Sequence, residues 1–380
     1  MSDRLVDVLI PVFNGEGTVR QAVESIQRQS IDNLKIIIVD DGSTDSTPQI
    51  LAEMSRSDPR IEVLNKANSG IVDALNLGLG HCRAEFVARQ DADDLAYPSR
   101  LADQIAYLSA NPECVALSGA ARHIDEHSNP TGVVARFGSP STADPNWVPS
   151  REPYLMHPFL VIRRSAVQQV QGYRHVFHAE DTDLYWRLME VGILHNMDTV
   201  LGDYRLHSQS ITGSSVLNGR IGALNAQLAS VSAMRRRGSR PDLTFPKDVI
   251  LEYQRARSLA GIFEVGRRTL DEDESAYLEI SLAAKMMELA AYKPYELEYD
   301  DCTYIRAAVV KHAHNLPADN CGMVQRYLSG TAARLAHKGL LKEAVALLPP
   351  GYYPATLARL AFRACVPKRA RQRLRNHPFK

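Results

Sequence analysis

The sequence contains no apolar stretch long enough to cross a membrane and no surplus of charge of either sign. No segment approaches the roughly 18–20 uninterrupted apolar residues of a membrane-spanning helix. Its 44 Lys and Arg residues balance 44 Asp and Glu residues, so the formal net charge is zero. A protein with this charge balance lacks the overall positive electrostatic field expected of one that coats nucleic acid. We therefore expect no nucleic-acid partner.

Cysteine is scarce and shows no pairing pattern. The five cysteines lie far apart and form no C-x-x-C pair, which argues against a disulfide framework or a thiolate zinc site. The N-terminal apolar run from Leu5 to Val12 is short and is interrupted by Asp7 and Pro11. It therefore predicts a first strand rather than a signal peptide. We expect a cytoplasmic protein, in which any membrane contact is peripheral and at the inner face.

Periodicity predicts an α/β fold with a mainly parallel sheet, followed by a helical region. β-Branched runs alternate with helical patterns over the first hundred residues, as in doubly wound sheets with helices on both faces. The predicted strands are 6–12, 35–40, 61–65 and 86–90, and the predicted helices are 18–29, 47–56 and 71–80. Mixed short strands follow, with a Pro/Ser/Asn-rich flexible loop at 139–151. We predict one domain at 1–213, with halves at about 1–110 and 111–213, and a helical region at 214–380 with a basic tail from about 357.

A pair of acids follows the second predicted strand, in Asp40-Asp41-Gly42-Ser43. Ligands of parallel sheets bind beyond the carboxyl ends of the strands. A carboxylate there can accept a hydrogen bond from a nucleobase N–H, such as the N3–H of uracil, and Asp41 is the preferred partner. The structural alternative is a turn into the next helix, with Gly42 as its permissive residue.

A second acidic group, Arg89-Gln90-Asp91-Ala92-Asp93-Asp94, follows the fourth predicted strand. The Asp-x-Asp spacing puts Asp91 and Asp93 on one side of an extended segment. Hard carboxylate oxygens of this kind bind Mg²⁺ or Mn²⁺ together with substrate phosphates. The alternative is capping of the helix that Pro98 opens, for which one acid would suffice.

The third acidic group, with Glu180 and Asp181, stands at the start of a short predicted helix at about 182–191. Acids in a first helical turn commonly complement the helix dipole. A carboxylate beside a diphosphate pocket can instead act as the general base that activates an acceptor hydroxyl. Two histidines, His157 and His207, adjoin predicted strands, and a lone histidine is more often structural than a ligand.

Taken in this order, with Pro11-Val12-Phe13-Asn14 ahead of them, these groups closely resemble the family 2 glycosyltransferases of GT-A fold, over about residues 5–212. The resemblance implies Asp181 as catalytic base, with Glu180 beside it, and a metal held by Asp91 and Asp93. Tyr204-Arg205-Leu206-His207 is similar to the family's ending, which implies His207 as a further metal or diphosphate ligand. The implied contacts to the sugar nucleotide are Pro11, Phe13, Asn14, Asp40, Asp41, Asn68, Asp91 and Glu180.

The implied activity is inverting transfer of a sugar from a nucleotide-diphosphate donor, a UDP-sugar, to a hydroxyl acceptor. The acceptor would be a glycan or a lipid-linked glycan in cell-surface polysaccharide or glycoconjugate synthesis, and the cofactor would be Mn²⁺ or Mg²⁺. The first half of the predicted domain would bind the donor and the second half the acceptor. One departure concerns Arg89 and Gln90, where the family often has an apolar residue or a methionine.

Three alternatives remain open from the sequence. A nucleotidyltransferase would need a basic phosphate loop, which Asn14-Gly15-Glu16-Gly17 lacks. A non-catalytic sugar-nucleotide-binding or scaffold protein would work through its helical C-terminal half, which is also where an oligomer would form.

The basic tail has no acid after Glu343, so it is either a solvated tail or an anchor for anionic membranes.

Overall fold

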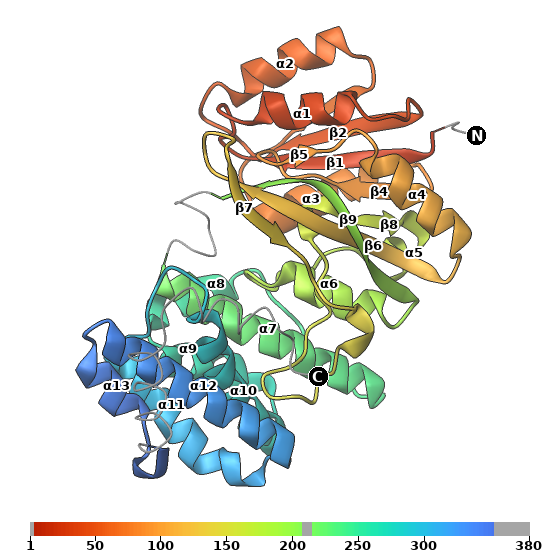
Figure 1. Cartoon of the computed structure of the whole chain (residues 1–380). Coiled ribbons are helices and arrows are strands. Elements are labelled where there is room, and N and C mark those ends of the chain that lie inside the picture. Colours follow the sequence, from red (N-terminus) through yellow and green to blue (C-terminus); the bar gives the residue numbers. More distant parts are fainter. Residues whose placement is uncertain (1–3, 207–214, 353–380) are drawn as a thin grey trace. The chain divides into compact units, whose positions relative to one another are not determined.

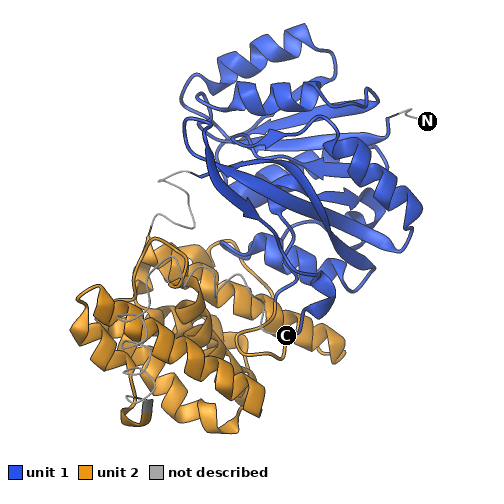
Figure 2. Ribbon diagram, viewed as in Figure 1, with its two compact units in different colours: residues 1–144, 152–210 blue, residues 145–151, 211–380 orange. Residues whose placement is uncertain are grey.

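The computed structural model describes residues 4–206 and 215–352 (Figure 1). The chain forms two compact units (Figure 2). Unit 1 comprises residues 1–144 and 152–210, and unit 2 comprises 145–151 and 211–380. The chain therefore passes between the units three times.

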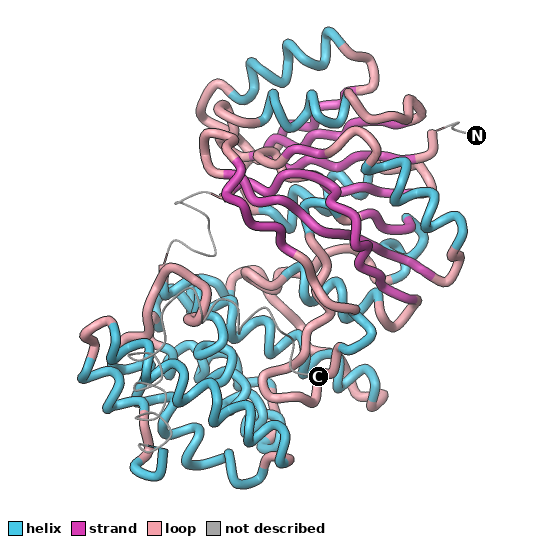
Figure 3. The backbone as a smooth tube through the Cα atoms, viewed as in Figure 1, coloured by secondary structure: helices cyan, strands magenta, loops and turns pink. Residues whose placement is uncertain are grey.

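Unit 1 contains one sheet with the strand order β3-β2-β1-β4-β8-β6-β9-β5, and β7 pairs with β6 (Figures 1 and 3). The strands are β1 Val6–Val12, β2 Leu34–Asp40, β3 Ile61–Asn65, β4 Phe86–Arg89, β5 Leu95–Ala96, β6 Cys114–Ile124, β7 Pro130–Ala135, β8 Val161–Arg163 and β9 Ile193–Arg205. The four strands from β3 to β4 are parallel, as expected. The next strand, β8, is antiparallel to β4, so the sheet as a whole is mixed.

The parallel strands end in register at one edge of the sheet. Val12 of β1 lies beside Asp40 of β2, and Asp40 lies beside Asn65 of β3. On the other side of β1, Leu9 lies beside Arg89, the last residue of β4. The loops that carry the first two acidic groups therefore leave the sheet along the same edge.

Both faces of the sheet are buried, which explains the uninterrupted apolar runs in its strands. Ile36 and Ile38 of β2 belong to one core cluster, and Ile37 and Val39 belong to the other. The first cluster is covered by α1 Val19–Gln27, α2 Thr47–Ser57 and α4 Arg100–Ala110. The second is covered by α3 Ile71–His81, α5 Arg164–Gln169 and α6 Glu180–Leu188.

Unit 2 is helical, as the periodicity predicts. Its helices are α7 Val216–Arg237, α8 Val249–Ala256, α9 Leu259–Gly266, α10 Glu272–Leu289, α11 Tyr299–His312, α12 Ala318–His337 and α13 Leu341–Leu347. The helical pattern at 249–265 is split into α8 and α9 at Arg257, which has a positive φ of 55°. Gly339, with a φ of 84°, makes the turn between α12 and α13.

The segment 145–151 is irregular, but it is tied to unit 2 and is not the flexible loop that its composition suggests. The Tyr277 hydroxyl donates to the Pro145 carbonyl at 2.6 Å, and the Ser150 N–H donates to Gln227 Oε1 at 3.1 Å. The Arg151 guanidinium lies 3.5 Å from the centroid of the Trp147 ring. Tyr277 and Gln227 are distant from this segment in the chain, so local composition does not reveal their contacts with it.

Within the two described ranges, no helix combines the length and the apolar character that a bilayer crossing requires. Four of the cysteines fall there, and all four are free thiols: Cys82, Cys114, Cys302 and Cys321.

Candidate active site

The loop after β1 is tied to the loop after β2 through Asn14. Its N–H donates to Ser43 Oγ at 2.8 Å, and its side-chain oxygen accepts a hydrogen bond from the Thr44 N–H at 2.8 Å. Asn14 adopts a positive φ of 51°, which asparagine tolerates better than most residues. Phe13, beside it, is 51% exposed, whereas Pro11 is buried within β1. Of these three predicted contacts, Phe13 presents its ring to solvent.

The two acids at the end of β2 make different contacts. Asp40 is 3% exposed, and its Oδ1 accepts a hydrogen bond from the Ser43 N–H at 2.9 Å, which closes the turn. Asp41 accepts hydrogen bonds from the N–H groups of Ser69 at 3.0 Å and Gly70 at 2.8 Å. Asp41 therefore anchors the loop between β3 and α3, which was not foreseen from the sequence.

That loop also approaches the β2 loop closely. Lys66 forms an ion pair with Asp41, and Asn68 is exposed beside it. Gly42 has a φ of 77°, and a Cβ atom there would lie 2.7 Å from the Asn68 nitrogen. A side chain at position 42 would therefore be strained and would push the loop away.

Asp91, Asp93 and Asp94 form a carboxylate cluster between β4 and β5, in which one oxygen from each lies within 4.8 Å of the others. They do not cap α4, because that helix begins at Arg100 after Ser99. Asp94 is 1% exposed, and its Oδ2 is buried without a hydrogen-bond partner among the described residues. Burial, followed by the charges of Asp91 and Asp93, raises the pKa of Asp94.

These features fit a divalent cation. Three carboxylate oxygens, which are hard metal ligands, converge, and one buried oxygen, Asp94 Oδ2, accepts no hydrogen bond from any described residue. Mg²⁺ and Mn²⁺ prefer such oxygen ligands, and they usually keep positions for substrate phosphates and water.

The end of β9 is joined to this cluster. The Arg205 N–H donates to Asp94 Oδ1 at 2.7 Å, and Arg205 Nε donates to the Asp93 carbonyl at 2.9 Å. The first described range ends at Leu206, whose N–H donates to the Ile124 carbonyl at 2.9 Å. The predicted ligand His207 lies just outside the described residues.

The third acidic group opens α6, on the face of the sheet that α3 and α5 also cover. Burial, followed by the charge of Asp181, raises the pKa of Glu180 to about 7. Burial also raises the pKa of Asp181, although the N–H of Thr182, 2.7 Å from its Oδ1, opposes the shift. Asp183 differs, because it is fully buried between Arg174 and Arg187 and pairs with both.

Arg89 connects the second and third acidic groups. It is 7% exposed, and its Nη2 lies 2.5 Å from Asp91 Oδ1. Its positive charge lowers the pKa of Glu180 and Asp181, against the effect of burial. Arg89 therefore pairs directly with Asp91, and its charge also acts on the two acids at the start of α6. The sequence signalled Arg89 only as a departure from the family pattern.

The remaining candidate, His157, fits a structural role. Its Nε2 lies 2.8 Å from the Tyr173 hydroxyl. Burial, followed by the charge of Arg89, holds the pKa of His157 well below its ordinary value. A neutral imidazole paired with a tyrosine agrees with the structural reading of this residue.

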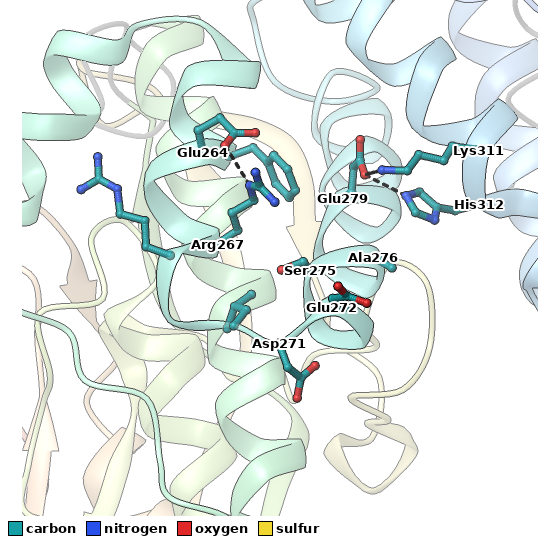
Figure 4. A pocket seen from close by; sticks show the side chains of 12 residues that line it. Glu264, Arg267, Asp271, Glu272, Ser275, Ala276, Glu279, Lys311 and His312 are labelled. Atoms are coloured by element: carbon teal, nitrogen blue, oxygen red, sulfur yellow. Dashed lines mark hydrogen bonds and ion pairs between the residues drawn. The ribbon is translucent and has the colours of Figure 1, made fainter.

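Unit 2 contains a separate cavity of about 670 Å³ between α9, α10 and α11 (Figure 4). Glu279 in its wall accepts hydrogen bonds at 2.8 Å from Lys311 Nζ and from His312 Nε2. Arg267 donates to Glu264 at 2.8 Å. Its charged groups thus largely satisfy one another, and the acids of the candidate active site belong to unit 1.

Comparisons with known proteins identify a family for the sequence of unit 1. Residues 7–171 match the family model Glycosyl transferase family 2. The chain is 33% identical over 192 residues to the putative glycosyltransferase EpsE of Bacillus subtilis, covering 49% of this chain and 67% of EpsE. It is 29% identical over 222 residues to the amylovoran biosynthesis glycosyltransferase AmsE of Erwinia amylovora, covering 57% of this chain and 80% of AmsE.

Two solved structures share the fold at 16% identity. One is Staphylococcus aureus TarS 1-349 in complex with UDP-GlcNAc, with a TM-score of 0.53 and coverage of 90% of this chain and 89% of TarS 1-349. The other is the mannosyltransferase PcManGT of Pyrobaculum calidifontis in complex with GDP-Man and Mn²⁺, with a TM-score of 0.51 and coverage of 94% and 87%. Fold and sequence agree with the resemblance drawn from the motifs, and the chain belongs to glycosyl transferase family 2.

Proposed function

We propose that the chain is an inverting glycosyltransferase that moves a sugar from a UDP-sugar to a hydroxyl group of a glycan or lipid-linked glycan. The product would be a cell-surface polysaccharide or glycoconjugate. One observation carries the proposal: Asp91, Asp93 and Asp94 form a carboxylate cluster, and Asp91 pairs with buried Arg89, whose charge also lowers the pKa of the base candidate Asp181. The sugar nucleotides in the TarS and PcManGT complexes and the Mn²⁺ in the latter support this reading.

Asp91 and Asp93 would hold Mn²⁺ or Mg²⁺, with His207 as a further ligand outside the described residues. Such a cation supplies electrostatic stabilisation for the charge that gathers on the departing diphosphate. Asp94 would hold the cluster in position from the protein interior, because it is buried and its Oδ1 accepts a hydrogen bond from the Arg205 N–H.

Asp181 would act as the general base. It would remove the proton of the acceptor hydroxyl as that oxygen attacks the anomeric carbon from the face opposite the leaving group. A single base suffices for inversion, and no covalent intermediate forms. The raised pKa of Asp181 makes its ionised form a stronger base than an exposed aspartate. Glu180 would contact the donor sugar beside it.

The donor base would bind at the loops after β1 and β2. A carboxylate offers about four acceptor sites, and the N–H groups of Ser69 and Gly70 together with Lys66 Nζ occupy three on Asp41. Asp41 can thus accept a base N–H as well, with Asp40 fixing the turn beneath it. Pro11, Phe13, Asn14 and Asn68 would complete the nucleotide site, and the exposed ring of Phe13 suits contact with the base.

A thermal-shift panel of UDP-, GDP- and dTDP-sugars, with and without Mn²⁺, tests the proposal through the mass-action stabilisation that a ligand confers. We expect a metal-dependent rise in the unfolding midpoint with a UDP-sugar. Transfer or hydrolysis of that donor would then exclude the scaffold alternative. A chain that no sugar nucleotide stabilises, with or without metal, would refute the proposal. Three further properties stay predictions: a cytoplasmic location, membrane contact by the basic tail, which lies outside the described residues, and oligomerisation through unit 2.

A further inference from the structure

Arg89 is a buried cation that leaves hydrogen-bonding capacity unused. Its Nη2 pairs with Asp91, but its Nε and Nη1 are buried and have no partner among the described residues. Buried donors are normally satisfied, so two open N–H groups on one guanidinium need an explanation.

A neighbouring arginine shows how a structural guanidinium is accommodated in the same core. Arg100 is fully buried, and all three of its nitrogens donate: Nε to Gln104 Oε1 at 3.1 Å, Nη1 to Gln90 Oε1 at 2.6 Å, and Nη2 to the Arg89 carbonyl at 2.6 Å. Arg89 lies next to this satisfied network and is not part of it through its own side chain. Its environment is therefore not explained by packing alone.

The charges around Arg89 indicate what it acts on. The pKa values of Glu180 and Asp181 respond to Arg89, whereas Arg174 and Arg187, the other arginines near α6, pair with Asp183. Carboxylates that approach one another in a buried site repel unless a cation lies among them.

We propose that Arg89 is a positioning residue for the transfer reaction: its buried ion pair fixes the Asp91 carboxylate for the metal and the donor, and its positive charge stabilises the ionised carboxylates at the start of α6. This inference rests on the proposed function and extends it. Asp91 acts on the donor side and Asp181 on the acceptor side, so loss of the Arg89 charge would disturb both sides of the site. Misplacement by about 1 Å can cost about 10²-fold in rate.

The test compares Arg89→Met, which keeps the length but removes the charge, with Arg89→Lys in the full chain. Arg163→Met is the matched control. Arg163 ends the adjacent strand β8 beside Phe86, three residues from Arg89, and its guanidinium donates to the carbonyls of Cys114 at 2.9 Å and Leu108 at 2.6 Å. The measurements are kcat, the donor KM, the half-saturating Mn²⁺ concentration and the unfolding midpoint.

We expect Arg89→Met to lower kcat by about 10²-fold when the donor and Mn²⁺ are both saturating. It should also raise the Mn²⁺ requirement, and Arg89→Lys should recover part of kcat. Arg163→Met should lower the unfolding midpoint and leave kcat unchanged. Arg89→Gln replaces the methionine variant if that variant does not fold.

Two results would overturn the inference: a kcat of the neutral variant within about threefold of wild type, or a lysine variant that is folded but no more active than the neutral one. If the wild-type chain binds no sugar nucleotide, the proposed function falls, and this inference falls with it. If the wild type transfers sugar and the Arg89 variants match it, the inference alone is refuted.

Discussion

Replacement of Asp181 by asparagine separates catalysis from stability. The change exchanges one carboxylate oxygen for an amide group, and the amide oxygen can still accept the hydrogen bond that Thr182 N–H makes at 2.7 Å. Loss of a general base typically costs about 10²–10⁴-fold in rate, which corresponds to about 2.7–5.4 kcal/mol of transition-state stabilisation. We expect the transfer rate of Asp181→Asn to fall by at least about 10²-fold, with donor affinity retained.

The effect on stability should have the opposite sign from that of an ordinary buried acid. Because burial raises the pKa of Asp181, the folded state binds the proton more tightly than the unfolded state does. Ionisation of Asp181 therefore lowers the free energy of unfolding as the pH rises above the pKa that this residue has in the unfolded chain. At neutral pH, the free energy of unfolding of Asp181→Asn should equal or exceed that of wild type.

Asp183→Asn is the matched control in the same helix. Asp183 is fully buried and pairs with Arg174 and Arg187, and breaking a buried pair costs about 3–5 kcal/mol. Initial transfer rates, donor calorimetry and denaturant unfolding should therefore show an inactive but stable Asp181→Asn and an unstable Asp183→Asn. Near-wild-type turnover by Asp181→Asn would remove Asp181 from the role of base, and a stability loss as large as that of the control would refute the electrostatic argument.

Three further predictions concern the metal, pH and the tail. Excess chelator or Asp93→Asn should weaken donor binding, and unchanged donor affinity in chelator would count against the metal role of Asp91 and Asp93. Turnover should fall on the acid side, because the base Asp181 must be ionised and burial raises its pKa above the ordinary value; a flat rate down to about pH 4, the ordinary pKa of an aspartate, would contradict this. A chain that ends at Leu348 should lose affinity for anionic vesicles, since basic residues near such a surface contribute about 1 kcal/mol each; full co-sedimentation would exclude the tail as anchor.

Local pattern was a good guide to the first half of unit 1. Strands at 6–12 and 61–65 were predicted with the bounds that the structure has, because these runs lie between clear turn residues and are flanked by helical repeats. Helical periodicity runs through 249–265, but the structure has two helices there, α8 and α9, because the backbone turns at Arg257. No glycine or proline marks that break, although Ser258, the next residue, caps α9 by accepting a hydrogen bond from the Gly261 N–H.

Long-range contacts account for what the pattern missed. The anchoring of Asp41 by Ser69 and Gly70 joins residues 28 and 29 positions apart. The attachment of segment 145–151 depends on Tyr277 and Gln227, which lie much further along the chain. Such pairings arise from packing, and composition within a window of ten residues carries no information on them.

The sequence by itself determined the chemistry of the site: acids after parallel strands must emerge at one edge of the sheet, because chain direction and strand period leave no other place for them. Only the tertiary structure decided which acids remain available. Asp40 and Asp41 are engaged by neighbouring backbone, whereas Asp91 pairs with the buried guanidinium of Arg89, whose charge also acts on Asp181 at the start of α6. The physical reason is that burial and neighbouring charge, which set the behaviour of a carboxylate, depend on residues that meet only when the chain has folded.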